Sequence, residues 1–115
     1  MNKLDEIIAK LDLQPHPEGG FFKETYRSEG EVSRDHLGEE YSGNRNYSTC
    51  IYFLLTSENH SNFHRIKQDE IWHFYEGSPI RLHTISEDGV HNSHIIGRDV
   101  LKDELPQLVV KGGDW

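Results

Sequence analysis

Apolar residues follow two different periods along this chain, and the change between them falls near residue 14. From about residue 2 to 12 they recur at the three- and four-residue spacing of an amphipathic helix. These residues are Leu4, Ile7, Ile8 and Leu11. Pro15 and Pro17 follow, and proline cannot continue a helix because it lacks the N–H donor. The pattern therefore predicts one short N-terminal helix.

Beyond residue 15, apolar residues gather in short runs rich in β-branched and aromatic side chains, with glycine and polar residues between them. We expect strands at residues 20–27, 48–56, 62–66, 71–75, 81–85, 91–96 and 108–110. Residues 87–89, Glu-Asp-Gly, are typical of a hairpin turn. The polar residues 28–46 predict a long mobile loop or lid. Short strands at regular spacing predict an all-β sandwich or barrel.

Length and charge limit the class of protein. The 115 residues suffice for one domain with a small core, of the kind that a second subunit often completes. A formal net charge of −8 argues against nucleic acid or an anionic membrane as the main partner. The charged N-terminus lacks a signal-peptide apolar block, and no segment reaches transmembrane length, so we expect a cytoplasmic protein. The single cysteine, Cys50, cannot form an internal disulfide and is expected to be a buried packing residue.

The stretch 61–77 carries the strongest candidate site, formed by His64 and Glu70. If two strands meet across a short turn here, the two side chains can point into one space. Alternation along the second strand would place Trp72 and Phe74 on the face of Glu70, which describes an aromatic-walled cavity with one imidazole and one carboxylate. Ile66 stands where a metal site of this kind would want its second imidazole.

Three roles remain open for the pair of His64 and Glu70. Imidazole titrates near neutral pH, so His64 suits a general base held by a carboxylate. Both side chains are also ligands of divalent metal ions. The third role is a buried hydrogen-bonded pair that only stabilises the barrel. We favour a functional role, because two ionisable groups in an apolar interior cost stability.

A second group of candidate residues follows the glycine pair at positions 19 and 20. Strict alternation would place Phe22, Glu24 and Tyr26 on one face of a strand, and Lys23 and Arg27 on the other. Such a segment is a pocket wall, a strand that crosses to a second subunit, or an edge strand with a solvated face. Arg45 precedes an apolar strand and is either an anion anchor or a surface arginine.

The remaining histidines show no tightly paired spacing, so the sequence does not predict a metal cluster among them. We expect His73 on the face opposite Glu70, exposed or in an interface. His83 and His94 lie in expected strands whose register is unknown. We expect His16, His36, His60 and His91 in solvated turns or loops.

The chain resembles a cupin through the motifs PHPEGGFFKETYRS, STCIYFLLTSE and FHRIKQDEIWHFYEGSP. With PQLVVKGGDW it is most similar to the branch called domain of unknown function 985, the fifth cupin family. The resemblance implies an all-β double-stranded β-helix, or cupin jelly roll, with one short N-terminal helix, and a homodimer formed through exchanged N-terminal strands. We expect an N-terminal helix and lead-in over residues 1–14 and a single cupin domain over residues 15–115. The glycine pair just before Trp115 is typical of a turn into another strand, so we expect the domain to lack its closing C-terminal strands, either because the protein is naturally short or because the sequence is part of a longer chain.

The resemblance also bears on metal binding. Typical metal cupins take two histidines and a glutamate from the first motif and a third histidine from the second. His64 matches the first histidine and Glu70 the glutamate, whereas Ile66 replaces the second histidine. The third would fall just beyond Trp115. At most two of the four usual ligands are therefore present.

The branch further resembles the metal-free deoxysugar-nucleotide epimerases, whose N-terminal strand carries a Gly-Phe-Phe-x-Glu pattern that residues 20–24 match. Those enzymes use a histidine base paired with an acid, together with a tyrosine acid. This implies His64 as the base and Glu70 as the residue that orients or tunes it. Tyr26, Tyr52 and Tyr75 are candidates for the tyrosine, and we assign the role to Tyr26.

The sequence therefore predicts a cupin that binds a small polar or carbohydrate-like molecule in its barrel without a cofactor and transfers a proton as an isomerase. The expected ligand-binding residues are Phe22, Glu24, Arg45, Tyr52, Trp72 and Phe74. One alternative is a metal-dependent cupin enzyme in which His64 and Glu70 hold one divalent ion. Another is a small-molecule-binding module without catalysis.

Overall fold

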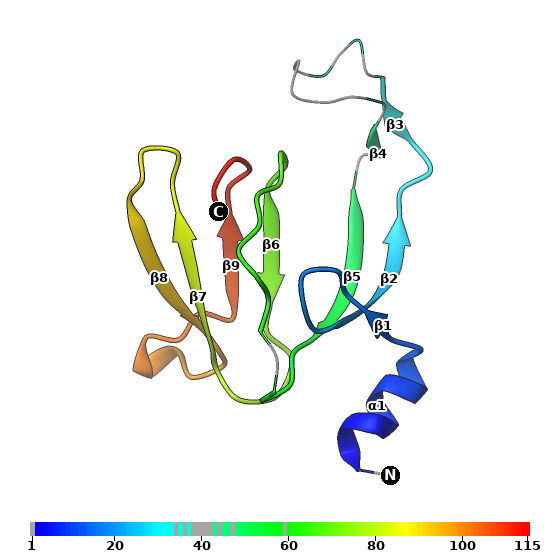
Figure 1. The fold of residues 1–115 in the computed structure, drawn as a ribbon, viewed down its shortest axis with the longest axis vertical. Coiled ribbons are helices and arrows are strands. Elements are labelled where there is room, and N and C mark those ends of the chain that lie inside the picture. The colour runs from blue at the N-terminus through cyan, green and yellow to red at the C-terminus, as the bar shows by residue number, and fades with distance from the viewer. Residues whose placement is uncertain are drawn as a thin grey trace. The chain divides into compact units, whose positions relative to one another are not determined.

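The computed structural model describes residues 2–33, 35, 37, 43, 45, 46, 48–58 and 60–115. The chain forms two compact units, Met1–Phe63 and His64–Trp115, and each has its own set of elements. The first unit contains α1 (Lys3–Leu11), β1 (Gln14–Pro15), β2 (Phe21–Arg27), β3 (Glu31–Val32), β4 (Arg45–Asn46) and β5 (Thr49–Leu54) (Figure 1). The second contains β6 (Glu70–His73), β7 (Ile80–Ile85), β8 (His91–Ile96), a 3₁₀ turn (Val100–Lys102) and β9 (Gln107–Val110).

Helix α1 is capped at both ends. The side chain of Asn2 accepts a hydrogen bond from the backbone N–H of Asp5 at 2.9 Å, which satisfies a donor that has no partner within the helix. At the other end Asp12 adopts the left-handed conformation with φ of 54°, and the N–H of Leu13 donates to the carbonyl of Ile8 at 2.9 Å. Leu13 is buried. The predicted helix is confirmed.

The first unit is built on a three-stranded antiparallel sheet in the order β1-β2-β5. Glu24 pairs with Ile51, but Tyr26 pairs with Cys50, so Thr25 is an extra residue and the register shifts at this point. Such a β-bulge reverses the alternation of side chains beyond it, because directly paired residues point to the same face. The bulge decides which candidate residues of this unit lie together.

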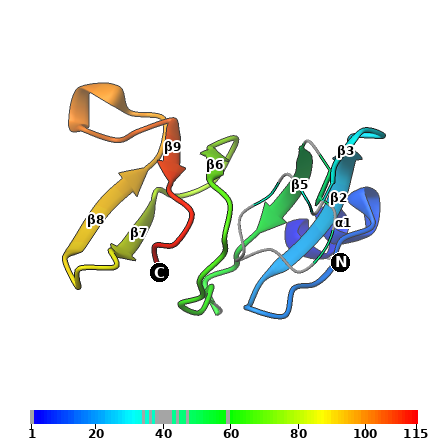
Figure 2. The same cartoon turned by 90° about the horizontal axis from the view of Figure 1, so that it is seen from above.

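The second unit contains two antiparallel strand pairs, β6 with β9 and β7 with β8. In the turn between β7 and β8, the N–H of Ser86 donates to the carbonyl of Val90 and that of Gly89 to Ser86, both at 2.9 Å. The predicted hairpin is confirmed, and β7 and β8 run side by side in two perpendicular views (Figure 1 and Figure 2). On the other edge of β7, Ile85 exchanges two backbone hydrogen bonds with Trp115, at 3.2 and 2.9 Å.

The strand expected at residues 62–66 is wrong, because residues 60–69 contain no strand. This stretch has no ladder of strand hydrogen bonds. Single backbone hydrogen bonds to two turns hold it. The N–H of Asn62 donates to the carbonyl of Glu18 at 2.7 Å, and the carbonyl of Ile66 accepts from the N–H of Gly113 at 2.8 Å. Two turns cannot offer the continuous row of donors and acceptors that a strand needs.

The stretch 28–46, expected as a long loop or lid, begins and ends in a short antiparallel pair. In it β3 pairs with β4, Glu31 with Asn46 and Val32 with Arg45. Residues 34, 36, 38–42 and 44 lie outside the described residues, and so does the expectation for His36. The lid stays a prediction.

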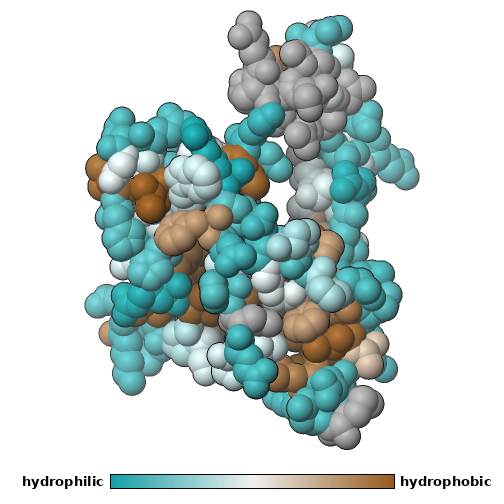
Figure 3. All heavy atoms as spheres, in the orientation of Figure 1, coloured by the Kyte–Doolittle hydropathy of each residue, from teal (hydrophilic) through white to brown (hydrophobic). Residues whose placement is uncertain are grey.

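Among the described residues, Leu13 and Ile96 are the buried apolar side chains. Large apolar side chains that expose more than half of their surface include Ile71, Tyr75, Val109 and Leu101. Apolar atoms accordingly appear at the surface of both units (Figure 3). One short helix followed by antiparallel strands confirms the predicted all-β class.

Candidate functional site

Strand β6 carries Glu70 on a half-buried face. Antiparallel pairing sets Glu70 opposite Val110 and Trp72 opposite Leu108 on β9, and all four side chains are half-buried. The residues that alternate with them on both strands are exposed. Since directly paired residues point to the same side, a carboxylate, an indole and two aliphatic side chains share one face. The predicted alternation along β6 is confirmed.

Phe74 continues this face just beyond the end of β6. Its side chain is half-buried like those of Glu70 and Trp72, while its neighbour Tyr75 is 73% exposed. The N–H of Phe74 donates to the carbonyl of Pro106 at 2.9 Å, which extends the contact between the two chain segments by one residue. The half-buried face therefore carries two aromatic rings beside one carboxylate.

His64 lies six residues before Glu70, in the irregular stretch. Its side chain is half-buried, as is that of Ile66, whereas the odd-numbered residues from 63 to 67 are exposed. On the exposed side, Nη2 of Arg65 forms an ion pair with Oε1 of Glu87 at 3.1 Å. Both predicted residues, His64 and Glu70, are therefore half-buried side chains of the second unit.

The turn of the KGGDW motif holds this stretch in place. The N–H of Gly113 donates to the carbonyl of Ile66, and the N–H of Gly112 to Oδ1 of Asp69, both at 2.8 Å. A Cβ at position 112 would collide with the carbonyl oxygen of Lys67, and Gly113 has φ of +92°. Glycine satisfies both requirements because it has no Cβ. The motif at the end of the chain therefore positions the backbone that leads into β6.

The bulge in β2 divides the candidate residues of the first unit between two faces. Phe22 and Glu24 lie on one face, but Tyr26 pairs with Cys50 and lies on the other, with Tyr52. The prediction that Tyr26 shares a face with Phe22 and Glu24 is wrong, because the extra residue reverses the alternation. Tyr26 and Tyr52 are 53% and 42% exposed. Cys50, expected to be buried, is exposed as well.

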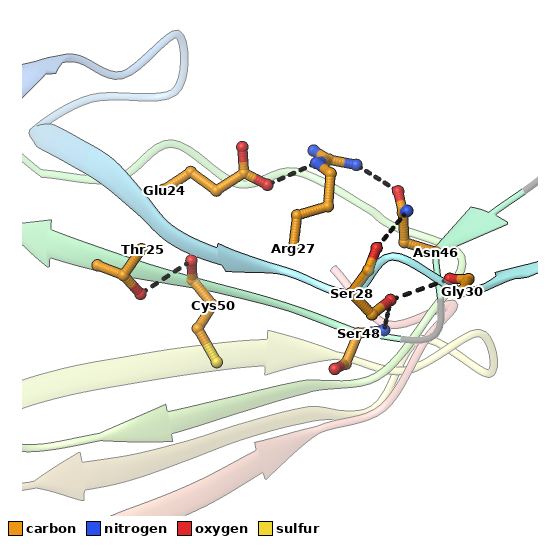
Figure 4. A network of polar contacts seen from close by, with 8 residues as sticks. All are labelled: Glu24, Thr25, Arg27, Ser28, Gly30, Asn46, Ser48 and Cys50. Carbon is orange, nitrogen blue, oxygen red and sulfur yellow. Dashed lines mark hydrogen bonds and ion pairs between the residues drawn. The ribbon is translucent and has the colours of Figure 1, made fainter.

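Glu24 belongs to a polar network at the end of β2 (Figure 4). Its Oε1 lies 2.7 Å from Nε of Arg27, which the bulge brings to the same face against the predicted alternation. Nη1 of Arg27 donates to Oδ1 of Asn46 at 2.6 Å, and Nδ2 of Asn46 donates to the carbonyl of Ser28 at 2.8 Å. The buried hydroxyl of Ser28 accepts from the N–H of Ser48 at 3.2 Å. The network ties β2 to β4 and to the start of β5.

Arg45, a candidate anion anchor or surface arginine, lies in β4, where its backbone pairs with Val32. Its side chain lies outside what the structure describes. Its role as an anion anchor stays a prediction.

His16 is a structural residue that the sequence reasoning missed. Expected in a solvated turn, it is half-buried, and its Nδ1 accepts a hydrogen bond from the N–H of Glu18 at 3.0 Å. Its ring lies edge-on to Phe22 and tilted against Phe53, with centroids 5.0 and 5.2 Å apart. The sequence could have indicated this position, because the prolines on both sides of His16 and the glycine pair after it predict a tight turn.

The register between β7 and β8 settles the positions of three further histidines. His83 is exposed on β7, and His94 is half-buried on β8. His91 is the first residue of β8, so the strand expected at residues 91–96 is confirmed and the separate assignment of His91 to a turn or loop is wrong. Nδ1 of His83 lies 2.9 Å from Nε2 of His91. Two histidines without a recognisable spacing in the sequence therefore meet in the fold.

The motifs whose geometry is described above also identify the family. A family model described as "Cupin superfamily (DUF985)" matches residues 5–115. The chain belongs to this cupin family. An uncharacterised protein of Saccharomyces cerevisiae, YML079W, is 34% identical to this cupin over 122 residues, which cover 97% of the chain and 58% of the relative. The chain thus spans less than two thirds of the length of this curated relative.

Two solved structures share the fold of this cupin. A hypothetical protein from Leishmania major has a TM-score of 0.86 and 36% identity, over 98% of this chain and 67% of its own. Protein SO0799 from Shewanella oneidensis has a TM-score of 0.85 and 34% identity, over 99% of this chain and 66% of its own. The names of these relatives state no activity, so the comparisons show the family and the fold.

In the part of the chain that the structure describes, the donor set at His64 and Glu70 does not fit a mononuclear metal centre. Among the described residues, no three or more His, Cys, Asp or Glu side chains are grouped so that they could hold a metal ion. Catalytic metal centres of this kind rest on three protein ligands or more. Within the same part of the chain, no helix has the length and apolar character needed to cross a membrane.

Proposed function

We propose that this cupin binds a small polar or carbohydrate-like molecule at the half-buried face of β6 and β9 and transfers a proton on it, as an isomerase or epimerase. The observation that supports the proposal is the combination of Glu70, Trp72 and Phe74 on one half-buried face of the unit that also holds a half-buried His64. Small-molecule sites are mostly apolar and aromatic, with few polar groups that fix the orientation of the ligand.

In this proposal His64 is the base. Its imidazole takes a proton from a carbon next to a carbonyl of the bound molecule, and the electron pair of the broken C–H bond moves onto the carbonyl oxygen. Glu70 orients the imidazole and stabilises the imidazolium that forms, since an opposite charge favours the charged form. Return of a proton to the opposite side of the carbon inverts it. Tyr26 as the acid of that step stays a prediction.

Ligand binding is tested with a thermal-shift screen of nucleotide sugars and small hydroxy acids. We expect one chemical class to raise the melting temperature of the wild type and to lose this effect with His64→Ala and with Glu70→Gln. The matched control is His73→Gln, an exposed histidine on the opposite face of β6, which should respond like the wild type. If both site variants keep the full response, the site lies elsewhere.

Proton transfer is tested by incubating the binding compound with the protein in D₂O. Proton NMR should show one carbon-bound hydrogen exchanging with solvent, and His64→Ala should slow this exchange about 100-fold or more, the usual contribution of a general base. A compound that binds without any exchange would mean that the cupin is a binding module without catalysis.

We also propose that this cupin forms a homodimer. The support is an exposed apolar pair on the outer face of the β6–β9 sheet, where Ile71 lies directly opposite Val109. Exposed apolar groups of this kind often mark contact surfaces. Light scattering should give the mass of two chains for the wild type and of one chain for Ile71→Glu. The control is Val90→Glu, which changes an exposed residue beside the β7–β8 turn and should leave the mass at two chains. A wild-type mass of one chain contradicts the proposal.

A further inference from the structure

The hairpin of β7 and β8 places two histidines on one face. Its register pairs His83 with Ser93 and Ile85 with His91, and residues two apart on a strand point to the same side. His83 and His91 are therefore diagonal neighbours, within reach of each other for aromatic side chains. The turn that sets this register is closed at Gly89, which has φ of +83°.

The two imidazoles meet through their nitrogen atoms. Nδ1 of His83 lies 2.9 Å from Nε2 of His91, the ring centroids are 5.1 Å apart, and the ring planes differ by 24°. The gap between the nitrogens accounts for most of the centroid separation, so the ring edges face each other. One nitrogen donates and the other accepts a single shared proton. Both residues are exposed, so an ion from solution reaches them directly.

We propose that His83 and His91 form a binding site for one divalent transition-metal ion of the class that prefers imidazole, such as Zn²⁺, Ni²⁺ or Cu²⁺. The protein supplies two ligands and water completes the coordination. Imidazole is the commonest metal ligand in proteins and suits these ions. The site is separate from His64 and Glu70 and does not depend on the proposed proton transfer.

The ion takes the place of the shared proton. Zinc–nitrogen bonds of about 2.0–2.1 Å at a tetrahedral angle put the two nitrogens about 3.3 Å apart. The two nitrogens are now 2.9 Å apart, so the rings need to move apart only slightly. The displaced proton passes through water to the other nitrogen of the ring that held it. Each ring then binds as neutral imidazole, and the step involves no oxidation or reduction. Protons compete with the ion, because a protonated ring has no free lone pair.

Charges on the hairpin favour a cation at the end that holds His91. The turn beside that end carries Asp88 and Glu87, both exposed, and the ion pair with Arg65 offsets the charge of Glu87, so Asp88 makes the larger contribution. Arg81 is on the same face of the hairpin, two residues before His83 and farther from the turn. A net charge of −8 also raises the local concentration of cations.

Trp115 provides an optical reporter of this site. Its backbone pairs with Ile85 through two hydrogen bonds, and Ile85 pairs with His91 on its other side. Directly paired residues point to the same side. Trp115 thus lies two strand spacings, about 10 Å, from His91. A paramagnetic ion held by the two histidines should quench indole fluorescence over this distance.

The test is a Zn²⁺ titration of the full chain, followed through the imidazole signals in ¹H–¹⁵N NMR spectra. The signals of His83 and His91 should shift together and saturate at one equivalent. His83→Gln and His91→Gln should each lower the affinity at least tenfold, whereas His73→Gln, another exposed strand histidine of the same unit, should leave it unchanged. Quenching by Cu²⁺ should shrink in Trp115→Phe.

Two results would overturn the proposal. One is a wild type in which the His83 and His91 signals stay unshifted, including the case in which Zn²⁺ shifts the His64 signal in their place. The other is a His83→Gln variant that binds Zn²⁺ as tightly as the wild type. Neither result bears on the proposed proton transfer, which is assayed separately with His64→Ala and Glu70→Gln.

Discussion

Two glycine turns, one in each unit, hold successive halves of the irregular stretch 60–69. In the first unit a Cβ at Gly19 would collide with the carbonyl oxygen of His60, and the carbonyl of Glu18 accepts from the N–H of Asn62 at 2.7 Å. In the second unit a Cβ at Gly112 would likewise collide with the carbonyl oxygen of Lys67. Each turn replaces a strand ladder with a close backbone contact and single hydrogen bonds.

The two turns differ in what they demand of their glycine. Gly19 has a left-handed φ of +115° and also lacks room for a Cβ, whereas the φ of Gly112 is outside the left-handed region and only space is lacking. Their side-chain anchors differ as well. His16 anchors the first turn through a part-buried hydrogen bond, and Asp69 anchors the second through an exposed one. The comparison predicts that the first turn is more sensitive to substitution.

Gly19→Ala should have the largest effect, because it adds backbone strain to a collision with a carbonyl group that cannot move aside. We expect a loss of about 3–5 kcal/mol in the free energy of unfolding, measured by urea denaturation. The control is Gly77→Ala, with a φ of +111° and no atom within 4 Å of the added Cβ, which should lose about 1–2 kcal/mol. Equal losses would mean that close packing at Gly19 adds nothing.

Gly112→Ala should have an intermediate effect, because it removes space without adding backbone strain. We expect a loss of about 2–3 kcal/mol, together with a shift of the His64 imidazole signal in NMR spectra. Gly43→Ala is the control, since its φ is outside the left-handed region and nothing lies within 4 Å of the added Cβ. It should be neutral or stabilise by about 0.5 kcal/mol. An unshifted His64 signal would contradict the role of this turn in positioning the site.

Substitution of the two side-chain anchors, His16 and Asp69, should lower the free energy of unfolding least. His16→Ala leaves the N–H of Glu18 without its partner and removes two ring contacts, so we expect a loss of about 1–2 kcal/mol. Asp69→Ala removes an exposed hydrogen bond to Gly112 and should cost about 0.5–1 kcal/mol. Thermal denaturation of both variants measures the difference. A larger loss for Asp69→Ala would reverse the order of the two turns.

The candidate site was predictable where it depends on one strand alone. Glu70 and Trp72 share a half-buried face because alternation along β6 follows from backbone geometry within four residues. The same rule failed in β2, where the bulge at Thr25 moves Tyr26 to the other face. A bulge depends on how the partner strand pairs, and the partner β5 is more than twenty residues away in the sequence.

The sequence by itself determined the helix, the strands β2 and β5 to β9, the hairpin turn at residues 87–89 and the half-buried face of Glu70. These features follow from hydrophobic periodicity and turn chemistry, which act between residues close together in the chain. Tertiary structure alone decided that residues 60–69 form no strand, that Tyr26 leaves the face of Phe22, and that His83 meets His91. The first two depend on the close approach or pairing of segments far apart in the sequence, and the third on the register across the hairpin, which the hydrophobic pattern alone does not encode.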